Sequence, residues 1–244
     1  MRNVIVTGGS RGLGLGIVKK LTSDGYRAIA IARKSNDQLA AAMEETKCAG
    51  AGALDFVPFD FDDLDDIPAL VKNLRGAFGP IYGLVNNAAL GFDGVLATMH
   101  NARIEHLVRV NTVAPIVLTK YVVRSMMSER CGRVVNVASI IGFTGYSGLS
   151  VYGATKASMI GFTHSLAREV GQLGVNVNAV APGFINTDMT QSLDDKQREQ
   201  VARRSALRRL PEVEDVAGTV AFLLGDGAKN ITGTVMTVDA GSTA

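Results

Sequence analysis

The sequence of 244 residues has no tryptophan and only two cysteines. Cys48 and Cys131 form no CxxC pair, and no histidine stands at the spacing of a zinc-ligand partner, so the sequence predicts no metal site and no disulfide framework. Cysteines used this sparingly are typical of a reducing compartment. We therefore expect a cytoplasmic protein.

Strong net charge and long apolar runs are also missing. The formal net charge of +2 is too small to indicate a nucleic-acid or membrane partner. The one basic run, in segment 203–209, is more typical of a solvated helix face than of a nucleic-acid site. The N-terminal stretch MRNVIVTGG carries one Arg before a short apolar run, and it lacks the longer apolar stretch and the cleavage site of a secretion signal. The uncharged stretch 134–155 is interrupted by Asn, Ser, Thr and Gly, unlike a transmembrane helix.

The sequence does contain a regular alternation of apolar runs and helix-length segments. Near-continuous apolar strands rich in β-branched residues are typical of a parallel sheet that helices cover on both faces. Their alternation with helices predicts a single doubly wound α/β domain, residues 1–244, with about seven strands. The strand-like runs are NVIVT (3–7), AIAIA (28–32), DFVPFD (55–60), YGLVN (82–86), RVVNVAS (133–139), VNVNAVA (175–181) and TVMTVD (234–239). The polar, charged segment 186–210 does not fit this pattern, and we expect it to form a lid over a substrate.

A glycine-rich loop follows the first predicted strand. In VIVTGGSRGLGLG, Gly8, Gly12 and Gly14 stand between that strand and an amphipathic helix. Glycines there permit a tight turn and let the backbone approach a pyrophosphate, whose charge is favoured at the N-terminus of the helix. The strand before and the helix after favour a Rossmann-type dinucleotide site over the alternative, a glycine-rich turn without a ligand.

Tyr152 and Lys156 stand four residues apart, and no other charged residue occurs from Val134 to Lys156. Residues at this spacing share one face of a helix. A neighbouring ammonium favours the phenolate, but lowering a tyrosine pKa by two to three units requires roughly 3–4 kcal/mol, more than an exposed ion pair supplies. We therefore expect the pair in a cleft with little water, where Lys156 lowers the pKa of Tyr152. The alternative is a packed tyrosine and a lysine that reaches solvent.

Several motifs occur together and in order: TGGSRGLG (7–14), NNAA (86–89), Asn111, Ser139, YGATK (152–156) and PGFINTDMT (182–190). Over essentially the whole chain they resemble the short-chain dehydrogenase/reductase family. SLAREV, VNAVAPGFINTDMT and ITGTVMTVDAG resemble its 3-oxoacyl-[acyl-carrier-protein] reductases. The resemblance implies that Tyr152 is the general acid, that Ser139 hydrogen-bonds the substrate oxygen and that Lys156 also binds the nicotinamide ribose. It further implies that Asn111 holds a water linking the lysine to solvent; the residues alone leave open an ordinary helix-interior asparagine.

The choice of dinucleotide depends on the end of the second predicted strand. An acidic residue there would bind the 2′-hydroxyl of NAD, but the chain has Ala32 followed by Arg33 and Lys34, and Arg11 adds a cation in the glycine loop. Guanidinium groups suit phosphate, so we expect NADP(H), with a solvated loop as the alternative. The family usually has NNAG where this chain has NNAA, and the effect of Ala89 is left open. The full set expected at the cofactor is Gly8, Ser10, Arg11, Gly12, Leu13, Gly14, Arg33, Asp60, Phe61, Asn87, Ala88, Tyr152, Lys156, Pro182, Gly183, Ile185 and Thr187.

The resemblance implies NADPH-dependent reduction of a 3-oxoacyl thioester carried by an acyl carrier protein or by coenzyme A. It also implies a homotetramer built through the helices that start near Asn101 and Tyr152 and through the C-terminal strand. One alternative is a reductase or dehydrogenase of another ketone, an alcohol or a sugar. Another is a dinucleotide sensor without turnover, which the intact Ser139, Tyr152 and Lys156 disfavour because a sensor needs no general acid.

An acidic carrier protein would be attracted by cations around the mouth of the cleft. Arg130 matches one arginine that carrier-using relatives place there, whereas Leu173 stands where the second is expected. Arg203, Arg204 and Arg208, in the expected lid, are candidates to replace it. We therefore expect only a modest preference for the carrier over coenzyme A.

Overall fold

A seven-stranded sheet forms the centre of the molecule. The computed structural model describes residues 1–185 and 195–244, with the backbone alone for residues 195–198. The sheet order is β3-β2-β1-β4-β5-β6-β7, and all neighbouring strands are parallel. The strands are β1 (Asn3–Thr7), β2 (Arg27–Ala32), β3 (Ala53–Pro58), β4 (Ile81–Asn86), β5 (Gly132–Val137), β6 (Val175–Pro182) and β7 (Val235–Val238).

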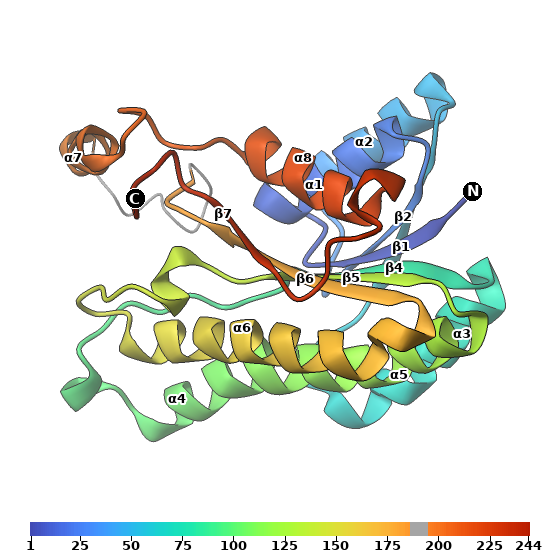
Figure 1. Cartoon of the computed structure of the whole chain (residues 1–244), viewed down its shortest axis with the longest axis horizontal. Helices are drawn as coiled ribbons and strands as arrows, with labels where there is room; N and C mark the ends of the chain where they lie inside the picture. Colours follow the sequence, from blue (N-terminus) through green and yellow to red (C-terminus); the bar gives the residue numbers. More distant parts are fainter. Residues whose placement is uncertain (186–194) are drawn as a thin grey trace.

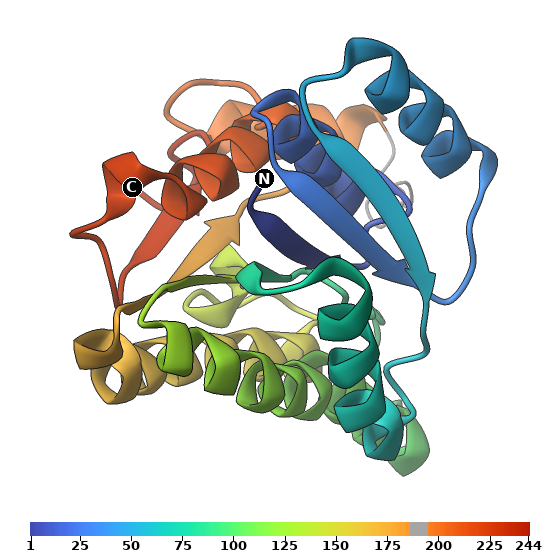
Figure 2. The same ribbon diagram turned by 90° about the vertical axis from the view of Figure 1, so that its right-hand side faces the viewer.

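Helices cover both faces of this sheet (Figure 1, Figure 2). One layer contains α1 (Gly12–Ser23), α2 (Asp37–Ala49) and α8 (Val213–Leu224). The other contains α3 (Ile67–Phe78), α4 (Asn101–Val108), α5 (Ala114–Glu129) and α6 (Ser150–Val170). A π-helical turn, η3 (Arg109–Val113), joins α4 to α5. The short helix α7 (Asp195–Arg204) lies at the end of the molecule near the C-terminus.

Alternate side chains of each strand enter opposite core layers. In β1, Val4 and Val6 pack with α1 and α8, whereas Ile5 packs with α3 and α5 on the other face, and all three are fully buried. Successive strand residues point to opposite faces, so a strand covered on both sides must be apolar throughout. The prediction of a doubly wound parallel sheet with about seven strands is therefore confirmed.

The strand order places a switch point between β1 and β4. The chain runs outward from β1 to β2 and β3, then returns to pair β4 with the other side of β1. The loops after β1 and β4 therefore diverge at the carboxyl edge of the sheet, where open sheets of this kind bind ligands. The charged segment 186–210 comes after β6 in the sequence; residues 186–194 lie outside the described residues, and residues 195–204 form α7.

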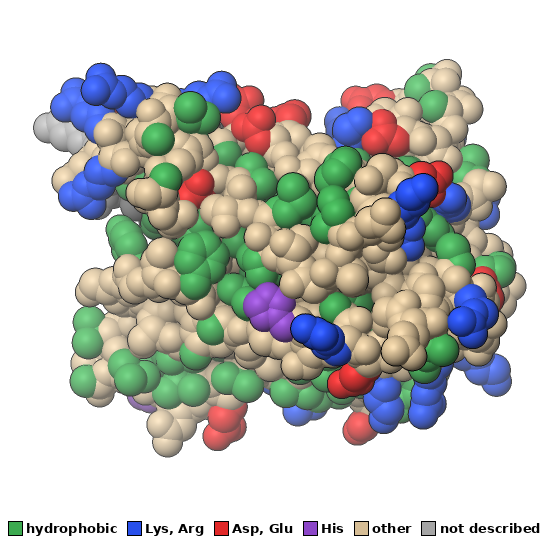
Figure 3. Space-filling model, in the orientation of Figure 1, with side chains coloured by type: hydrophobic (Ala, Val, Ile, Leu, Met, Phe, Trp, Pro, Cys, Tyr) green, Lys and Arg blue, Asp and Glu red, His purple; other side chains and the backbone are tan. Residues whose placement is uncertain are grey.

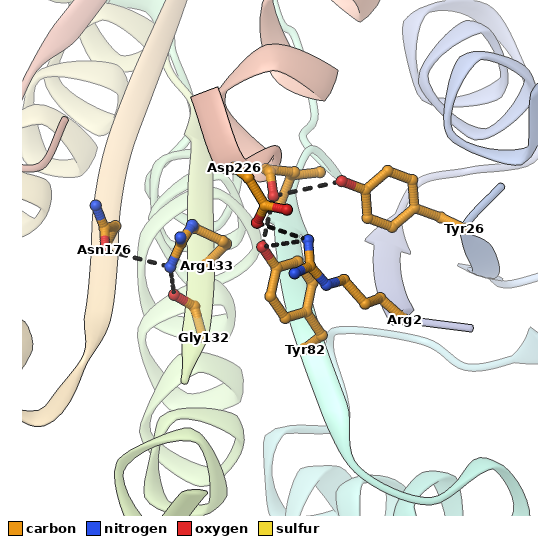
Figure 4. Close-up of polar contacts among 8 residues, drawn as sticks. Arg2, Tyr26, Tyr82, Gly132, Arg133, Asn176 and Asp226 are labelled. Atoms are coloured by element: carbon orange, nitrogen blue, oxygen red, sulfur yellow. Dashed lines mark hydrogen bonds and ion pairs between the residues drawn. The ribbon is translucent and has the colours of Figure 1, made fainter. Parts of the chain in front are cut away.

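A polar network closes the opposite, amino edge of the sheet (Figure 4). Arg2 Nη1 donates to Asp226 Oδ1 at 2.9 Å, and its guanidinium lies over the ring of Tyr82. The Tyr82 hydroxyl donates to the Leu224 carbonyl at 2.7 Å, at the end of α8, and the buried Arg133 lies against the same ring. This network ties β1, β4 and β5 to α8.

In the part of the chain that the structure describes, no helix is long and apolar enough to span a bilayer.

Candidate active site

The glycine loop between β1 and α1 depends on residues without a Cβ. Gly8 has φ +67°, a conformation that favours glycine. A Cβ on Gly14 would lie 2.1 Å from the carbonyl oxygen of Gly8, so the start of α1 packs directly on the loop backbone. Arg11, the N-cap residue of α1, makes no side-chain capping bond to that helix. The first-turn N–H groups are thus arranged as they are in anion sites at helix N-termini.

The loop after β4 is bonded to the glycine loop through Thr7. Its Oγ1 accepts hydrogen bonds from the backbone N–H groups of Asn87 and Ala88, both at 2.9 Å. The Asn87 side chain donates to the Thr7 carbonyl at 2.8 Å, so this amide holds two loops together. Ala89 is not among the residues with positive φ, so its methyl group strains no backbone. Sequence reasoning used Thr7 only as the start of a motif, and its role as a connector carried no sequence signal.

The turn after β2 supplies positive charge beside the glycine loop. Arg33 and Lys34 are exposed there, directly after Ala32. Asn36 caps α2 by accepting from Leu39 N at 2.9 Å, and its amide donates to the Ser10 carbonyl at 3.0 Å, which ties this turn to the glycine loop. The capping pattern could have been found from the sequence, since Asn is a preferred N-cap. The residues present therefore fit a dinucleotide that carries a phosphate on its adenosine ribose.

The other expected cofactor residues lie along the same carboxyl edge. Asp60 follows β3, and its Oδ1 accepts from Asp62 N at 3.2 Å. Phe61 is buried, with its ring against that of Phe59. Gly183 follows β6 and packs against Asp239, because a Cβ there would lie 2.8 Å from the Asp239 Cβ. Gly12, Leu13, Pro182 and Ile185 are partly or fully buried along this edge, and Thr187 lies outside the described residues.

Ser139, Tyr152 and Lys156 meet beyond the end of β5. Ser139 lies just after the strand, where its Oγ accepts from Ile141 N at 3.2 Å and forms a hydrogen bond with the Tyr152 side chain. Tyr152 and Lys156 project from successive turns of α6, as their spacing predicts. Lys156 is only 4% exposed; its Nζ donates to the Val137 carbonyl at 2.8 Å and lies 5.6 Å from the centre of the Tyr152 ring.

Burial controls the protonation of this pair. It raises the pKa of Tyr152 to about 12, although the hydrogen bond with Ser139 acts in the opposite direction. It lowers the pKa of Lys156 to about 8. The expected lowering of the Tyr152 pKa by Lys156 is thus wrong for the chain by itself, because the ammonium is bonded to a backbone carbonyl and loss of water favours both neutral forms. At neutral pH the phenol therefore keeps the proton that a general acid must donate.

Asn111 lies in η3, and its side chain bridges two other segments of the chain. Its Oδ1 accepts from Leu90 N and its Nδ2 donates to the Leu90 carbonyl, both at 2.8 Å. The same amide nitrogen contacts Thr155 Oγ1 at 3.3 Å, next to Lys156. Asn111 thus joins the loop after β4 to α6, a role that neither its neighbours in sequence nor those of Thr155 indicate.

Exposed apolar side chains lie on two loops, one after β4 and one between β5 and α6. Loops 91–100 and 143–149 are joined by a hydrogen bond from Gly94 N to the Gly148 carbonyl at 3.0 Å. The second loop separates Ser139 from Tyr152 in the chain, and its Tyr146 ring contacts that of Phe184. The exposed side chains are Val95, Leu96, Phe143 and Tyr146. We call these four residues the apolar rim.

Arg130 does not lie at the mouth of its own cleft. It ends α5 immediately before β5, and its Nη2 donates to the Gln172 carbonyl at 3.2 Å. Ser139 follows the other end of β5, and a strand of this length spans roughly 20 Å. The expectation that Arg130 stands at the entrance is therefore wrong within one chain, because it precedes the strand that Ser139 follows.

Known proteins are similar to this chain in both sequence and fold. A family model described as short chain dehydrogenase matches residues 2–198. The chain belongs to the short-chain dehydrogenase family. It is similar to 3-oxoacyl-[acyl-carrier-protein] reductase FabG from Salmonella typhimurium, with 38% identity over 97% of this chain and 95% of that protein. FabG from Staphylococcus aureus is 36% identical over 98% of this chain and 97% of that protein.

Solved structures of short-chain dehydrogenases have the same fold. A Burkholderia cenocepacia enzyme, solved in complex with NADP, has a TM-score of 0.90 at 32% identity and covers 100% of this chain and 98% of its own. One from Mycobacterium ulcerans has a TM-score of 0.92 at 29% identity and covers 99% of this chain and 89% of its own. As a short-chain dehydrogenase, the chain is an oxidoreductase.

Proposed function

We propose that the protein uses NADPH to reduce a 3-oxoacyl thioester to the 3-hydroxyacyl thioester. The observation that carries the substrate class is the apolar rim: four exposed apolar side chains on the loops that follow β4 and β5 suit an acyl chain and offer a sugar few hydrogen bonds. The FabG relatives, named for this reaction, support it.

The proposed mechanism assigns each step to a side chain. When bound, NADPH supplies the hydride that reduces the carbonyl carbon. Tyr152, protonated at neutral pH, donates its proton to the carbonyl oxygen, and Ser139 hydrogen-bonds the same oxygen as its charge develops. Lys156 stabilises the resulting phenolate and binds the nicotinamide ribose, and Asn111 fixes the turn of α6 that carries the lysine and holds the water through which protons return.

The exposed Arg33 and Lys34, with Arg11 in the glycine loop, support NADP(H) over NAD(H) because guanidinium and ammonium groups bind a 2′-phosphate. Asp60 and Phe61 are assigned to the adenine side of the same cofactor. Free Cys48 and Cys131 accord with a cytoplasmic enzyme.

Basic side chains gather over α7 and the segment after it (Figure 3). Arg203 is paired with Glu199, whereas Arg204, Arg208 and Arg209 are exposed around Leu207, itself 61% exposed. We assign this surface to an acidic acyl carrier protein, in place of the docking arginine that the chain lacks at Leu173. In the same proposal, residues 1–244 act as one catalytic domain with segment 186–210 as the lid.

Exposed apolar residues on two other surfaces support a homotetramer. Val108 and Val113 lie on α4 and η3, and Phe222 lies on α8 beside the C-terminal strand. Sedimentation at several protein concentrations tests this state, and a monomer at all of them would contradict it.

Steady-state rates of NADPH oxidation test the proposed reaction. The panel contains 3-oxoacyl thioesters on carrier protein and on coenzyme A, simple ketones and keto sugars. We expect thioesters to be reduced with the highest kcat/KM. Activity on ketones or sugars alone would favour the alternative reductase, and dinucleotide binding without turnover of any substrate would indicate a sensor.

A further inference from the structure

Asp62 attaches the loop between β3 and α3 to the helical segment formed by α4 and η3. Asp62 Oδ2 lies 2.8 Å from His106 Nε2, and because a carboxylate only accepts, the imidazole N–H donates. The Asp62 backbone carbonyl accepts from Arg109 Nε at 3.1 Å. His106 and Arg109 stand three residues apart on α4 and η3, so both meet Asp62 from one helix face.

Asp62 in turn holds the residue assigned to adenine. Its backbone N–H donates to Asp60 Oδ1 at 3.2 Å, and Asp63 N donates to the Asp60 carbonyl at 3.1 Å. Phe59 N donates to the Ala32 carbonyl at 3.0 Å, beside the cationic turn after β2. A shift of Asp62 would therefore move Asp60, because the two are joined by a tight turn.

The partners of Asp62 lie in the surface, where ion pairs contribute little to stability. The side chains of Asp62, His106 and Arg109 are 38%, 41% and 51% exposed. Yet two donors from one helix converge on a single residue of this loop. Arg109 is also the first residue of η3, in which Asn111 holds the loop after β4. The loops after β3 and β4 are thus both fixed from this one segment.

We propose that Asp62, His106 and Arg109 form an adenine-loop clamp: positioning residues that set the adenine end of the nucleotide site without touching the reacting atoms. The inference rests on the proposed function, since it takes Asp60 and Phe61 to line the adenine. Its consequence is specific. Loss of the clamp weakens binding of the adenosine half of the cofactor and leaves the chemistry at Tyr152 unchanged.

Calorimetric titration with adenosine 2′,5′-bisphosphate, which carries the adenine and the 2′-phosphate but no nicotinamide, tests the clamp. His106→Ala and Arg109→Ala should each weaken binding of this probe about three- to tenfold and raise the KM for NADPH by a similar factor. The kcat at saturating NADPH and the KM for the carbonyl substrate should stay within about twofold. His106→Gln, whose side-chain amide can donate in place of the imidazole, should restore part of the affinity. His164→Ala, at an exposed histidine of α6, is the matched control and should bind as wild type.

Three results would overturn the clamp. The first is unchanged affinity of both alanine variants for the bisphosphate. The second is a fall in kcat and a rise in both KM values by similar factors, together with a lower melting temperature, which would indicate a purely structural role. The third is failure of the wild type to bind either NADPH or the bisphosphate. That result alone would also refute the proposed function, so the two failures are distinguishable.

Discussion

At the scale of single residues, Tyr152 holds a proton that burial makes hard to remove. Its pKa of about 12 keeps the phenol neutral at pH 7, and its hydroxyl is bonded to Ser139. Tyr152→Phe removes the proton donor and leaves the ring. We expect kcat to fall by ~10²–10⁴, the usual contribution of a general acid, with unchanged affinity for NADPH by calorimetry. Activity within tenfold of wild type would refute the assignment.

Lys156 makes stability depend on pH. Burial lowers its pKa from the usual 10.5 to about 8, so between these values the unfolded chain binds a proton that the folded chain lacks, and stability rises with pH. Below pH 8 the cost of burying the charge is fully present, up to ~3 kcal/mol. We therefore expect Lys156→Met to be inactive but more stable than wild type at pH 7, by an amount that shrinks as the pH rises from 8 to 10.5.

Urea unfolding at pH 7 and pH 9.5, at one protein concentration, measures the effect of Lys156→Met. Lys34→Met, which removes an exposed charge, should change stability little at either pH. A destabilised Lys156→Met variant at pH 7, or an advantage that grows with pH, would contradict the argument.

The grouping of the chemical residues could be predicted from the sequence, but their environment could not. The i, i+4 spacing places Tyr152 and Lys156 on one face of a helix, and Ser139 follows a strand that ends at the same edge. The direction of the Tyr152 pKa shift depends on how much water the folded chain excludes. The partners of Asn111 come from residues 90 and 155, and no local pattern announces a contact over such distances in sequence.

At the scale of elements, the loop between β1 and α1 tolerates no side chain at Gly14. A Cβ there would lie 2.1 Å from backbone oxygen, so Gly14→Ala must move the loop or the helix. We expect at least a tenfold loss of NADPH affinity together with a lower melting temperature. Gly76→Ala, in α3, is the matched control because nothing lies within 4 Å of its added Cβ. It should be neutral or stabilise by about 0.5–1 kcal/mol. Normal NADPH binding by Gly14→Ala would contradict the close packing.

The turn after β2 should set the choice of coenzyme. If Arg33 binds the 2′-phosphate, Arg33→Ala should lower the ratio of kcat/KM for NADPH over NADH by about tenfold or more, most visibly at low salt. Arg75→Ala, which removes an exposed arginine from α3, should leave the ratio unchanged. Equal use of both coenzymes by the wild type would refute the assignment.

Element boundaries are less predictable than element identity. The sequence pattern predicts the third strand at 55–60, but β3 spans Ala53–Pro58 because Ala53 pairs with Arg27 of β2. Pro58 lacks an N–H group and stands at the end of this edge strand, where proline is tolerated. Pairing partners, which the sequence does not display, decide where a strand starts.

At the scale of the whole molecule, charge should govern the encounter with a carrier protein. We expect carrier-bound and coenzyme A-bound 3-oxoacyl substrates to have similar kcat/KM, with a modest carrier preference that falls as salt rises. Arg204→Glu combined with Arg208→Glu should remove that preference and leave kcat on a small thioester unchanged. Arg75→Glu serves as the control. A thousandfold preference that survives high salt would contradict electrostatic docking.

The position of Arg130 shows where whole-molecule reasoning from sequence can fail. The alternation of strands and helices predicts the parallel sheet, and in such a sheet every strand starts at one edge and ends at the other. Arg130 precedes β5 and Ser139 follows it, so the order of the two residues already separates them. Arg130 would approach a cleft only if that cleft belonged to another copy of the chain in an oligomer.

The central place of β1 has a consequence for how the protein is made. During synthesis β1 and β2 leave the ribosome early, but the second neighbour of β1 is β4, which ends at Asn86. From then on the growing sheet has an unpaired edge strand. This is first β4, then β5 and then β6, and each waits for a partner strand that is synthesised more than thirty residues later. Such edges pair readily with other chains, and contacts between segments far apart in sequence form slowly. Recombinant production should therefore yield more intact protein at low temperature and slow expression than at high yield in warm cells.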